Sequence, residues 1–194
     1  MSSAPELRLT PTPGQTIGPF YGYALPFKDG EKLVDRSHPG AVRLHGTVYD
    51  GAGAPVPDSL LEIWQADEHG TVVSEPGSLL RDGYTFTGWG RQAVDNVGYF
   101  SFTTVNPGAT EPGKAPFIQL VVCARGLLNR LFTRIYLPED EAALAADPLL
   151  ASLPPERRSS LIATREADGS LRFDVHLQGE RETVFLSFPR NGEA

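Results

Sequence analysis

The side chains in this sequence that most often bind transition metals are few and widely separated. The four histidines are His38, His45, His69 and His176, and no two of them have the short spacing of a metal-binding pair. His45 and His176 occupy polar positions of alternating segments, so we expect them at the surface or at a contact between subunits. The histidines therefore do not predict a metal site.

Other reactive side chains are also explained by packing. The only cysteine, Cys123, lies in the apolar run 120–124 and should pack as a small apolar residue. Glu62 has mostly apolar neighbours, which predicts an ion pair or a position facing an opening, in preference to a role as general base. Arg91 fits a salt bridge or a solvated position, and the acidic run 139–141 is typical of a helix N-terminus. Aromatic packing, in preference to metal binding, is expected for Tyr49, Tyr84, Tyr99 and Tyr136.

These residues must be positioned by many short elements. Alternation and short apolar runs predict strands at 42–48, 60–64, 98–103, 117–124, 134–137, 171–178 and 183–188. A short helical segment is expected within residues 138–160, with a helix that starts after Pro138 and stops before Pro148. The pattern predicts a mostly β, two-sheet β-sandwich over residues 41–190, preceded by a long N-terminal arm, 1–40, in a single domain of residues 1–194.

The composition restricts the possible partners. The chain has 194 residues, a net charge of −7 and no run rich in lysine or arginine, so nucleic acid is not an expected partner. One well-placed arginine could still bind an anionic small molecule. The sequence shows neither a targeting segment nor about 20 consecutive apolar residues, and we therefore expect no membrane association and a cytoplasmic location.

The segment from Leu44 to Val72 carries a specific resemblance. Its pattern Leu44-x-Gly46-x-Val48, followed by the run 61–67 and by Gly70-x-Val72, is similar to the signature of the intradiol dioxygenases, which cleave catechols with iron(III). Later segments resemble the same family in the same order: 98–102, 106–108 and 133–136. The N-terminal segment 12–20 and the C-terminal segment 178–185 resemble the iron-free alpha subunits of family members that cleave protocatechuate.

The resemblance implies that catalytic members hold iron with two tyrosines and two histidines. The matching positions here are Val72, Thr110 (with Ala109 beside it), Phe117 and Gln119. None of these side chains is a donor of the family's type. The resemblance therefore implies that this chain binds no iron, and that Fe(III) is held by a beta subunit of the same fold in a large alpha–beta hetero-oligomer that converts protocatechuate and O₂ to 3-carboxy-cis,cis-muconate.

Two regions of the chain could contribute to the partner's pocket. The resemblance places Arg134 next to that pocket, where a guanidinium could bind the substrate carboxylate; the alternative is a strand-edge arginine paired with an acid. It also implies that the arm residues Thr16, Gly18, Pro19 and Phe20 shape the cavity, although the arm could instead pack on its own sandwich.

We expect Trp64 in the core and Trp89 in a flexible segment that could anchor an interface.

Two other functions are compatible with parts of the sequence. A non-enzymatic binding module of the transthyretin type would explain the sandwich but not the N-terminal and C-terminal motifs. A self-sufficient dioxygenase with relocated ligands would need iron in the isolated chain.

Overall fold

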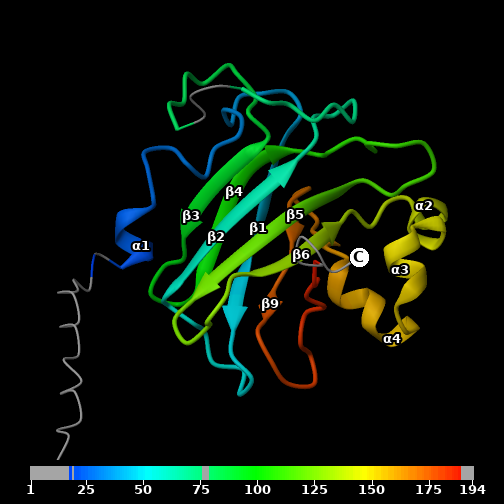
Figure 1. The fold of residues 1–194 in the computed structure, drawn as a ribbon. Coiled ribbons are helices and arrows are strands. Elements are labelled where there is room, and N and C mark those ends of the chain that lie inside the picture. Colours follow the sequence, from blue (N-terminus) through cyan, green and yellow to red (C-terminus); the bar gives the residue numbers. More distant parts are fainter. Residues whose placement is uncertain (1–17, 19, 76–78, 189–194) are drawn as a thin grey trace, which may run out of the picture.

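The fold consists of two β-sheets that lie face to face, with short helices at one end (Figure 1). The computed structural model describes residues 18, 20–75 and 79–188. The five-stranded sheet has the order β4-β1-β8-β7, with β9 also paired to β1, and the four-stranded sheet has the order β3-β2-β5-β6. The strands are β1 Ala41–Tyr49, β2 Ser59–Gln65, β3 Trp89–Ala93, β4 Tyr99–Val105, β5 Phe117–Ala124, β6 Leu131–Tyr136, β7 Thr164–Arg165, β8 Leu171–Arg172 and β9 Val175–His176. The prediction of a mostly β, two-sheet fold is confirmed.

The core lies between the two sheets. Because side chains alternate along a strand, Leu61 and Ile63 of β2 point inward while their neighbours point outward. Both are fully buried in a cluster that includes Phe100 and Phe102 of β4 and Leu120 of β5. Burying each such side chain contributes roughly 1.5–3 kcal/mol. This packing fixes which side chains remain available on the outer face of each sheet.

The predicted strand 171–178 is interrupted in the structure. β8 and β9 each have two residues and both pair in parallel with β1. The interruption falls at Asp174, whose side chain accepts a hydrogen bond from the backbone N–H of Thr47 at 3.0 Å in place of a strand carbonyl. A Cβ added at Gly46 would overlap the carbonyl oxygen of Phe173, so only glycine lets β1 lie this close to the interrupted segment.

The expectation that residues 183–188 form the last strand is wrong. The N–H of Thr183 bonds to His176 of β9, and the N–H of Leu186 bonds to Phe132 of β6. The segment therefore bridges the two sheets with isolated hydrogen bonds instead of forming a ladder with one of them. Conversely, β3 was not predicted, because the glycines in residues 88–90 hide the strand pattern.

Short helices cover the end of β5 and β6. They are α2 Glu141–Ala146, α3 Pro148–Ser152, α4 Pro155–Arg158 and the 3₁₀ helix Ser159–Leu161, while α1 Tyr21–Ala24 lies in the arm. The predicted helix between Pro138 and Pro148 is confirmed by α2, which Asp140 caps through the N–H of Ala143. Within residues 18, 20–75 and 79–188, no helix has the length and apolar character needed to cross a bilayer.

Candidate functional site

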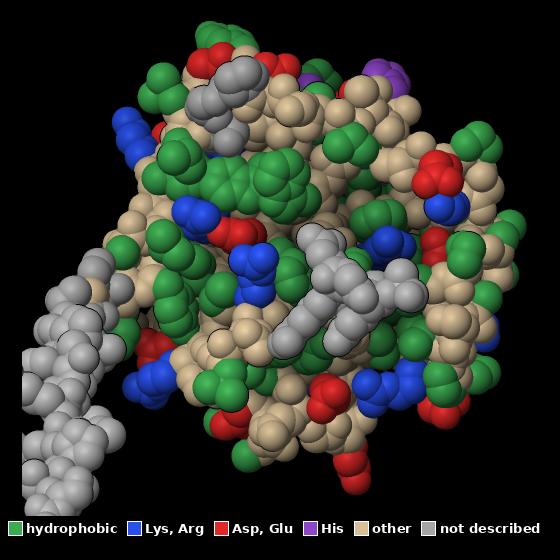
Figure 2. Space-filling model, viewed as in Figure 1, with side chains coloured by type: hydrophobic (Ala, Val, Ile, Leu, Met, Phe, Trp, Pro, Cys, Tyr) green, Lys and Arg blue, Asp and Glu red, His purple; other side chains and the backbone are tan. Residues whose placement is uncertain are grey.

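The outer face of the four-stranded sheet carries most of the predicted site residues. We define this face as the side chains of β3, β2, β5 and β6 that point away from the core. The four-stranded sheet lies in front in Figure 1, so Figure 2 shows this face, with hydrophobic side chains around a few charged ones. Two rows of paired residues cross it: Trp89, Trp64, Gln119 and Arg134, and beside them Arg91, Glu62, Val121 and Phe132.

Phe117 and Gln119 lie on the outer face, as their two-residue spacing predicts for a strand. Phe117 packs with the second apolar cluster, which contains Tyr136 and Leu150, and its ring lies 5.9 Å from that of Tyr136. Gln119 is half-buried and faces Arg134 across the β5–β6 pair. Of these two positions, which the resemblance assigns to iron donors, one is occupied by a packing residue and the other by a neutral amide.

The loops that carry Val72 and Thr110 lie against each other. The N–H of Gly108 donates to the carbonyl of Asp67 at 2.7 Å, and a Cβ on Gly70 would overlap the carbonyl oxygen of Ala109. The structure thus brings together two segments that are far apart in sequence. Val72 and Thr110 are both exposed, with 67% of Val72 accessible.

The side chains at these four positions do not fit the iron used by the intradiol dioxygenases. Iron(III) requires hard anionic or imidazole donors. Val72 and Phe117 have no donor atom, and Thr110 and Gln119 offer only a neutral hydroxyl and a neutral amide. Among the residues that the structure describes, no group of three or more histidine, cysteine, aspartate or glutamate side chains is placed to hold a metal.

Arg134 is held on this face by two neighbours. Its guanidinium carbon lies 3.9 Å from the centre of the Phe117 ring, a cation–π contact. Its Nη1 donates to the hydroxyl of Tyr136 at 3.3 Å. Its Nε is buried and has no hydrogen-bond partner in the part of the chain that the structure describes. Arg134 does lie on the edge strand β6, as the alternative had it, but no acidic side chain of the described residues pairs with it.

Glu62 and Arg91 form an ion pair in the middle of the outer face, with an oxygen–nitrogen distance of 2.6 Å. The expectation that Glu62 is paired is confirmed. The expectation for Trp64 is wrong: it is 47% exposed on this face, because the alternation of β2 directs Ile63 and Gln65 inward. Gln65 is buried and its amide donates to the carbonyl of Val105 at 2.9 Å, which compensates for burying a polar group.

The expectation of a flexible segment at Trp89 is also wrong. Trp89 belongs to β3, is 7% exposed and stacks on Phe27 with the rings 5.5 Å apart. The guanidinium of Arg91 lies 5.0 Å from its ring centre. This side chain is fixed by its own chain, whereas Trp64 beside it is free to contact another protein.

The described part of the N-terminal arm is only partly packed on the sandwich. Tyr21 donates from its hydroxyl to the carbonyl of Asp58 at 2.6 Å, which attaches α1 to the start of β2. Phe20 and Tyr23 are 69% and 86% exposed, so the described residues leave most of each side chain uncovered. Gly18 has a φ of 68°, a left-handed conformation that favours glycine. The predicted site residues Thr16 and Pro19 lie outside the described residues.

The histidines and the cysteine lie elsewhere. The expectation of a surface position for His45 is wrong: it is 8% exposed, with its Nε2 3.0 Å from a carboxylate oxygen of Glu166. His176 is half-buried and stacks on Tyr49 with ring centres 5.1 Å apart. Cys123 is half-buried at the end of β5, and burial raises the pKa of its thiol, as expected for a thiol that is not a nucleophile.

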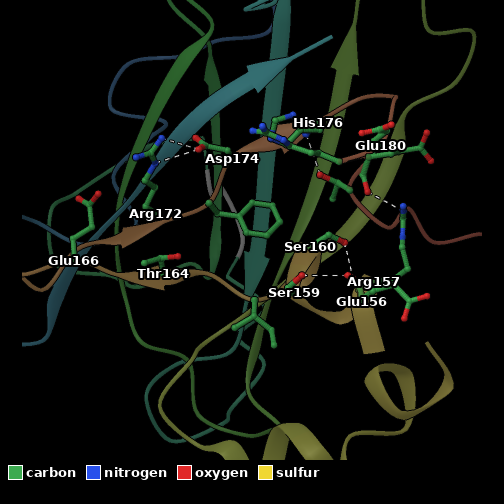
Figure 3. Close-up of a pocket in the computed structure, with 15 residues that line it drawn as sticks. Glu156, Arg157, Ser159, Ser160, Thr164, Glu166, Arg172, Asp174, His176 and Glu180 are labelled. Carbon is green, nitrogen blue, oxygen red and sulfur yellow. Dashed lines mark hydrogen bonds and ion pairs between the residues drawn. The ribbon is translucent and has the colours of Figure 1, made fainter. Parts of the chain in front are cut away.

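A polar cavity of about 550 Å³ lies between the five-stranded sheet and α4 (Figure 3). Two of its arginines already have partners: Arg172 pairs with Asp174 at 2.8 Å, and Arg157 donates to the carbonyl of Glu182. None of the predicted site residues lines it. The cavity therefore does not belong to the candidate site.

The two face-to-face sheets and the outer face described above agree with what comparison with known proteins shows. A family model described as Dioxygenase matches residues 17–179, and the chain belongs to this family, the intradiol dioxygenases. A solved dioxygenase domain from Streptomyces sp. SirexAA-E is similar in structure, with a TM-score of 0.59 and 29% identity over 88% of this chain and 99% of that one.

Two relatives from one organism are more specific. The chain is 38% identical to the protocatechuate 3,4-dioxygenase alpha chain of Burkholderia cepacia, over 92% of this chain and 98% of the relative. It is 32% identical to the beta chain of the same organism's enzyme, over 80% of this chain and 70% of the relative. The chain is thus similar to both an alpha-type and a beta-type chain, and it matches the alpha-type chain over nearly the whole length of that chain.

Proposed function

We propose that this chain is the iron-free alpha subunit of a protocatechuate 3,4-dioxygenase. The observation that carries the proposal is the set of side chains at Val72, Thr110, Phe117 and Gln119, which cannot replace two phenolates and two imidazoles. The resemblance to the Burkholderia cepacia alpha chain over 98% of that chain supports it. A related beta-type chain would hold the iron(III), which supplies the chemistry that opens the aromatic ring with O₂.

The outer face of the four-stranded sheet is the surface proposed to meet the beta subunit. It places Trp64, 47% exposed, beside the Glu62–Arg91 ion pair, which combines an aromatic anchor with a satisfied charge pair. The exposed rings of Phe20 and Tyr23 extend the apolar surface along the arm. We expect the arm residues Thr16, Gly18, Pro19 and Phe20 to form one wall of the partner's pocket in a large hetero-oligomer.

Arg134 is the proposed contact to the substrate. Protocatechuate carries a carboxylate beside its two hydroxyls, and a guanidinium is charged at all relevant pH values. No acid of the described residues neutralises Arg134, and Phe117 and Tyr136 hold it in place. This chain would therefore contribute electrostatic recognition, while the chemical step takes place on the partner.

The test separates this proposal from its alternatives. We expect the purified chain to contain no iron and to lack the red colour of phenolate-to-iron(III) charge transfer. Co-expression with an iron-bearing beta-type homologue should give a coloured complex that cleaves protocatechuate. Iron at one equivalent and ring cleavage by the chain alone would instead indicate relocated ligands. Failure to form any complex with a beta-type chain would favour a transthyretin-like binding module.

Deletion of residues 1–20 tests the arm separately. If the arm shapes the partner's pocket, the truncated chain should still assemble with the beta subunit but give a complex with a lower kcat/KM for protocatechuate. Unchanged turnover would show that the arm does not contribute to the pocket.

A further inference from the structure

We propose that Tyr136, held by Asp147, is a positioning residue that fixes the orientation of Arg134. The inference rests on the proposed contact between Arg134 and the substrate carboxylate. It assigns a role to a buried hydrogen-bonded pair that the sequence analysis did not connect with the site.

The connection is a continuous chain of hydrogen bonds. Arg134 Nη1 donates to the hydroxyl of Tyr136 at 3.3 Å, and that hydroxyl donates to a carboxylate oxygen of Asp147 at 3.0 Å. The same oxygen of Asp147 accepts the N–H groups of Leu149 and Leu150 at the start of α3. Tyr136 is fully buried and Asp147 is 2% exposed, so water does not compete for the bond between them.

The direction of the bonds explains why two residues are needed. An ionised carboxylate can only accept, so Asp147 fixes the hydroxyl hydrogen of Tyr136 toward itself. The lone pairs of the phenol oxygen are then available to accept from Arg134. Without Asp147 the hydroxyl hydrogen could rotate, and the phenol would no longer be a dependable acceptor for the guanidinium.

The remaining geometry leaves part of the guanidinium available. Phe117 covers the guanidinium at 3.9 Å, Tyr136 accepts from Nη1, and Nε is buried, whereas Nη2 makes no hydrogen bond with the described residues and is not buried. A planar guanidinium held in this way loses less freedom when it binds a carboxylate. Burial raises the pKa of Tyr136 to about 12, so the phenol stays protonated throughout the usual assay range.

The experiment uses the complex of this chain with its beta subunit and two substrates, protocatechuate and catechol, which lacks the carboxylate. We expect Tyr136→Phe to raise KM for protocatechuate about fivefold, the size expected for one lost hydrogen bond, with kcat changed less than about twofold. KM for catechol should not change. Asp147→Asn should raise KM for protocatechuate in the same substrate-dependent way, by a smaller factor.

Thr104→Val is the matched control. It removes a buried hydroxyl that donates to a side-chain oxygen, Oε1 of Gln65, at 2.7 Å, on β4 of the other sheet and away from both the arm and Arg134. We expect this variant to behave as the wild type with both substrates. In addition, Tyr136→Phe should have no further effect in an Arg134→Ala background, because its influence passes through the arginine.

Each outcome is informative. Equal KM changes for the two substrates, or additive effects in the double variant, would show a merely structural role for Tyr136 and overturn the inference. If Arg134→Ala changes KM for protocatechuate while Tyr136→Phe does not, the inference fails but the proposed role of Arg134 stands. If Arg134→Ala itself has no effect, both fail.

Discussion

Replacement of Arg134 by alanine should reduce turnover of protocatechuate by the complex without changing its iron content. A hydrogen bond to a charged group contributes about 1.5–3 kcal/mol, and each 1.4 kcal/mol corresponds to about a tenfold change. The loss of one such contact therefore predicts a decrease in kcat/KM of about 10- to 100-fold. The structure supports a value in this range, because Phe117 and Tyr136 already restrict the guanidinium before substrate arrives.

The assay is steady-state oxygen consumption with protocatechuate and with catechol, together with metal analysis of each complex. Arg130→Ala provides a matched control, since Arg130 also lies over an aromatic ring, that of Phe132, at 5.3 Å. It should change kcat/KM less than about twofold. An unchanged kcat/KM for Arg134→Ala with protocatechuate, or an equal decrease with catechol, would refute a contact to the carboxylate.

Three further predictions concern stability of the chain. Gly46→Ala should lower the free energy of unfolding by about 1–3 kcal/mol in urea titrations, because the added methyl group overlaps the backbone of Phe173. Asp147→Ala should destabilise the chain more than Asp140→Ala, because Asp147 is buried and accepts three hydrogen bonds whereas Asp140 caps α2 at the surface. The Tm values of the two variants in thermal melts would test this order. Burial lowers the pKa of His176 below its ordinary 6.5, so the unfolded chain binds more protons at this residue than the folded chain does. The stability that neutral His176 contributes is therefore present above pH 6.5 and is lost as the pH falls toward the folded pKa. His176→Gln should reduce the difference in Tm between pH 5 and pH 8.

Local pattern was sufficient to predict the strands that alternate cleanly. Residues 117–124 were predicted as a strand and coincide with β5, and 42–48 falls within β1. The prediction failed where tertiary contacts replace the strand ladder. Asp174 interrupts an alternating segment by bonding to Thr47, and no sequence period reveals which backbone group a side chain will reach.

The burial of individual residues was harder to predict than the strands themselves. An alternating segment shows which residues share a face, but it does not show which face meets the core. Trp64 was expected inside because it lies in the motif strand, whereas Gln65 is inside because Val105 and Thr104 satisfy its amide. His45 was expected outside because it is polar, and it is buried because Glu166 provides a partner.

The sequence showed which side chains stand at the expected donor positions, but it did not show which contacts these side chains make. The positions of Val72, Thr110, Phe117 and Gln119 followed from the family pattern, and their side-chain chemistry could be judged directly. The contact of Phe117 with Arg134 and the link from Tyr136 to Asp147 join residues from different elements. The first contact depends on the register of β5 and β6, and the second on the packing of α3 against the sheet, neither of which a local pattern contains.

The four positions that the resemblance assigns to iron donors differ in their structural setting, and this bears on whether iron donors could be introduced here. Val72 and Thr110 lie on exposed loops, where a tyrosine could be removed or restored with little effect on packing. Phe117 is integrated in an apolar cluster and covers the guanidinium of Arg134, so a histidine there would lose buried contacts and place a second basic group beside the arginine. Restoring all four donors would therefore disturb the arginine that we propose to serve the partner, which makes iron binding and substrate recognition competing uses of the same face.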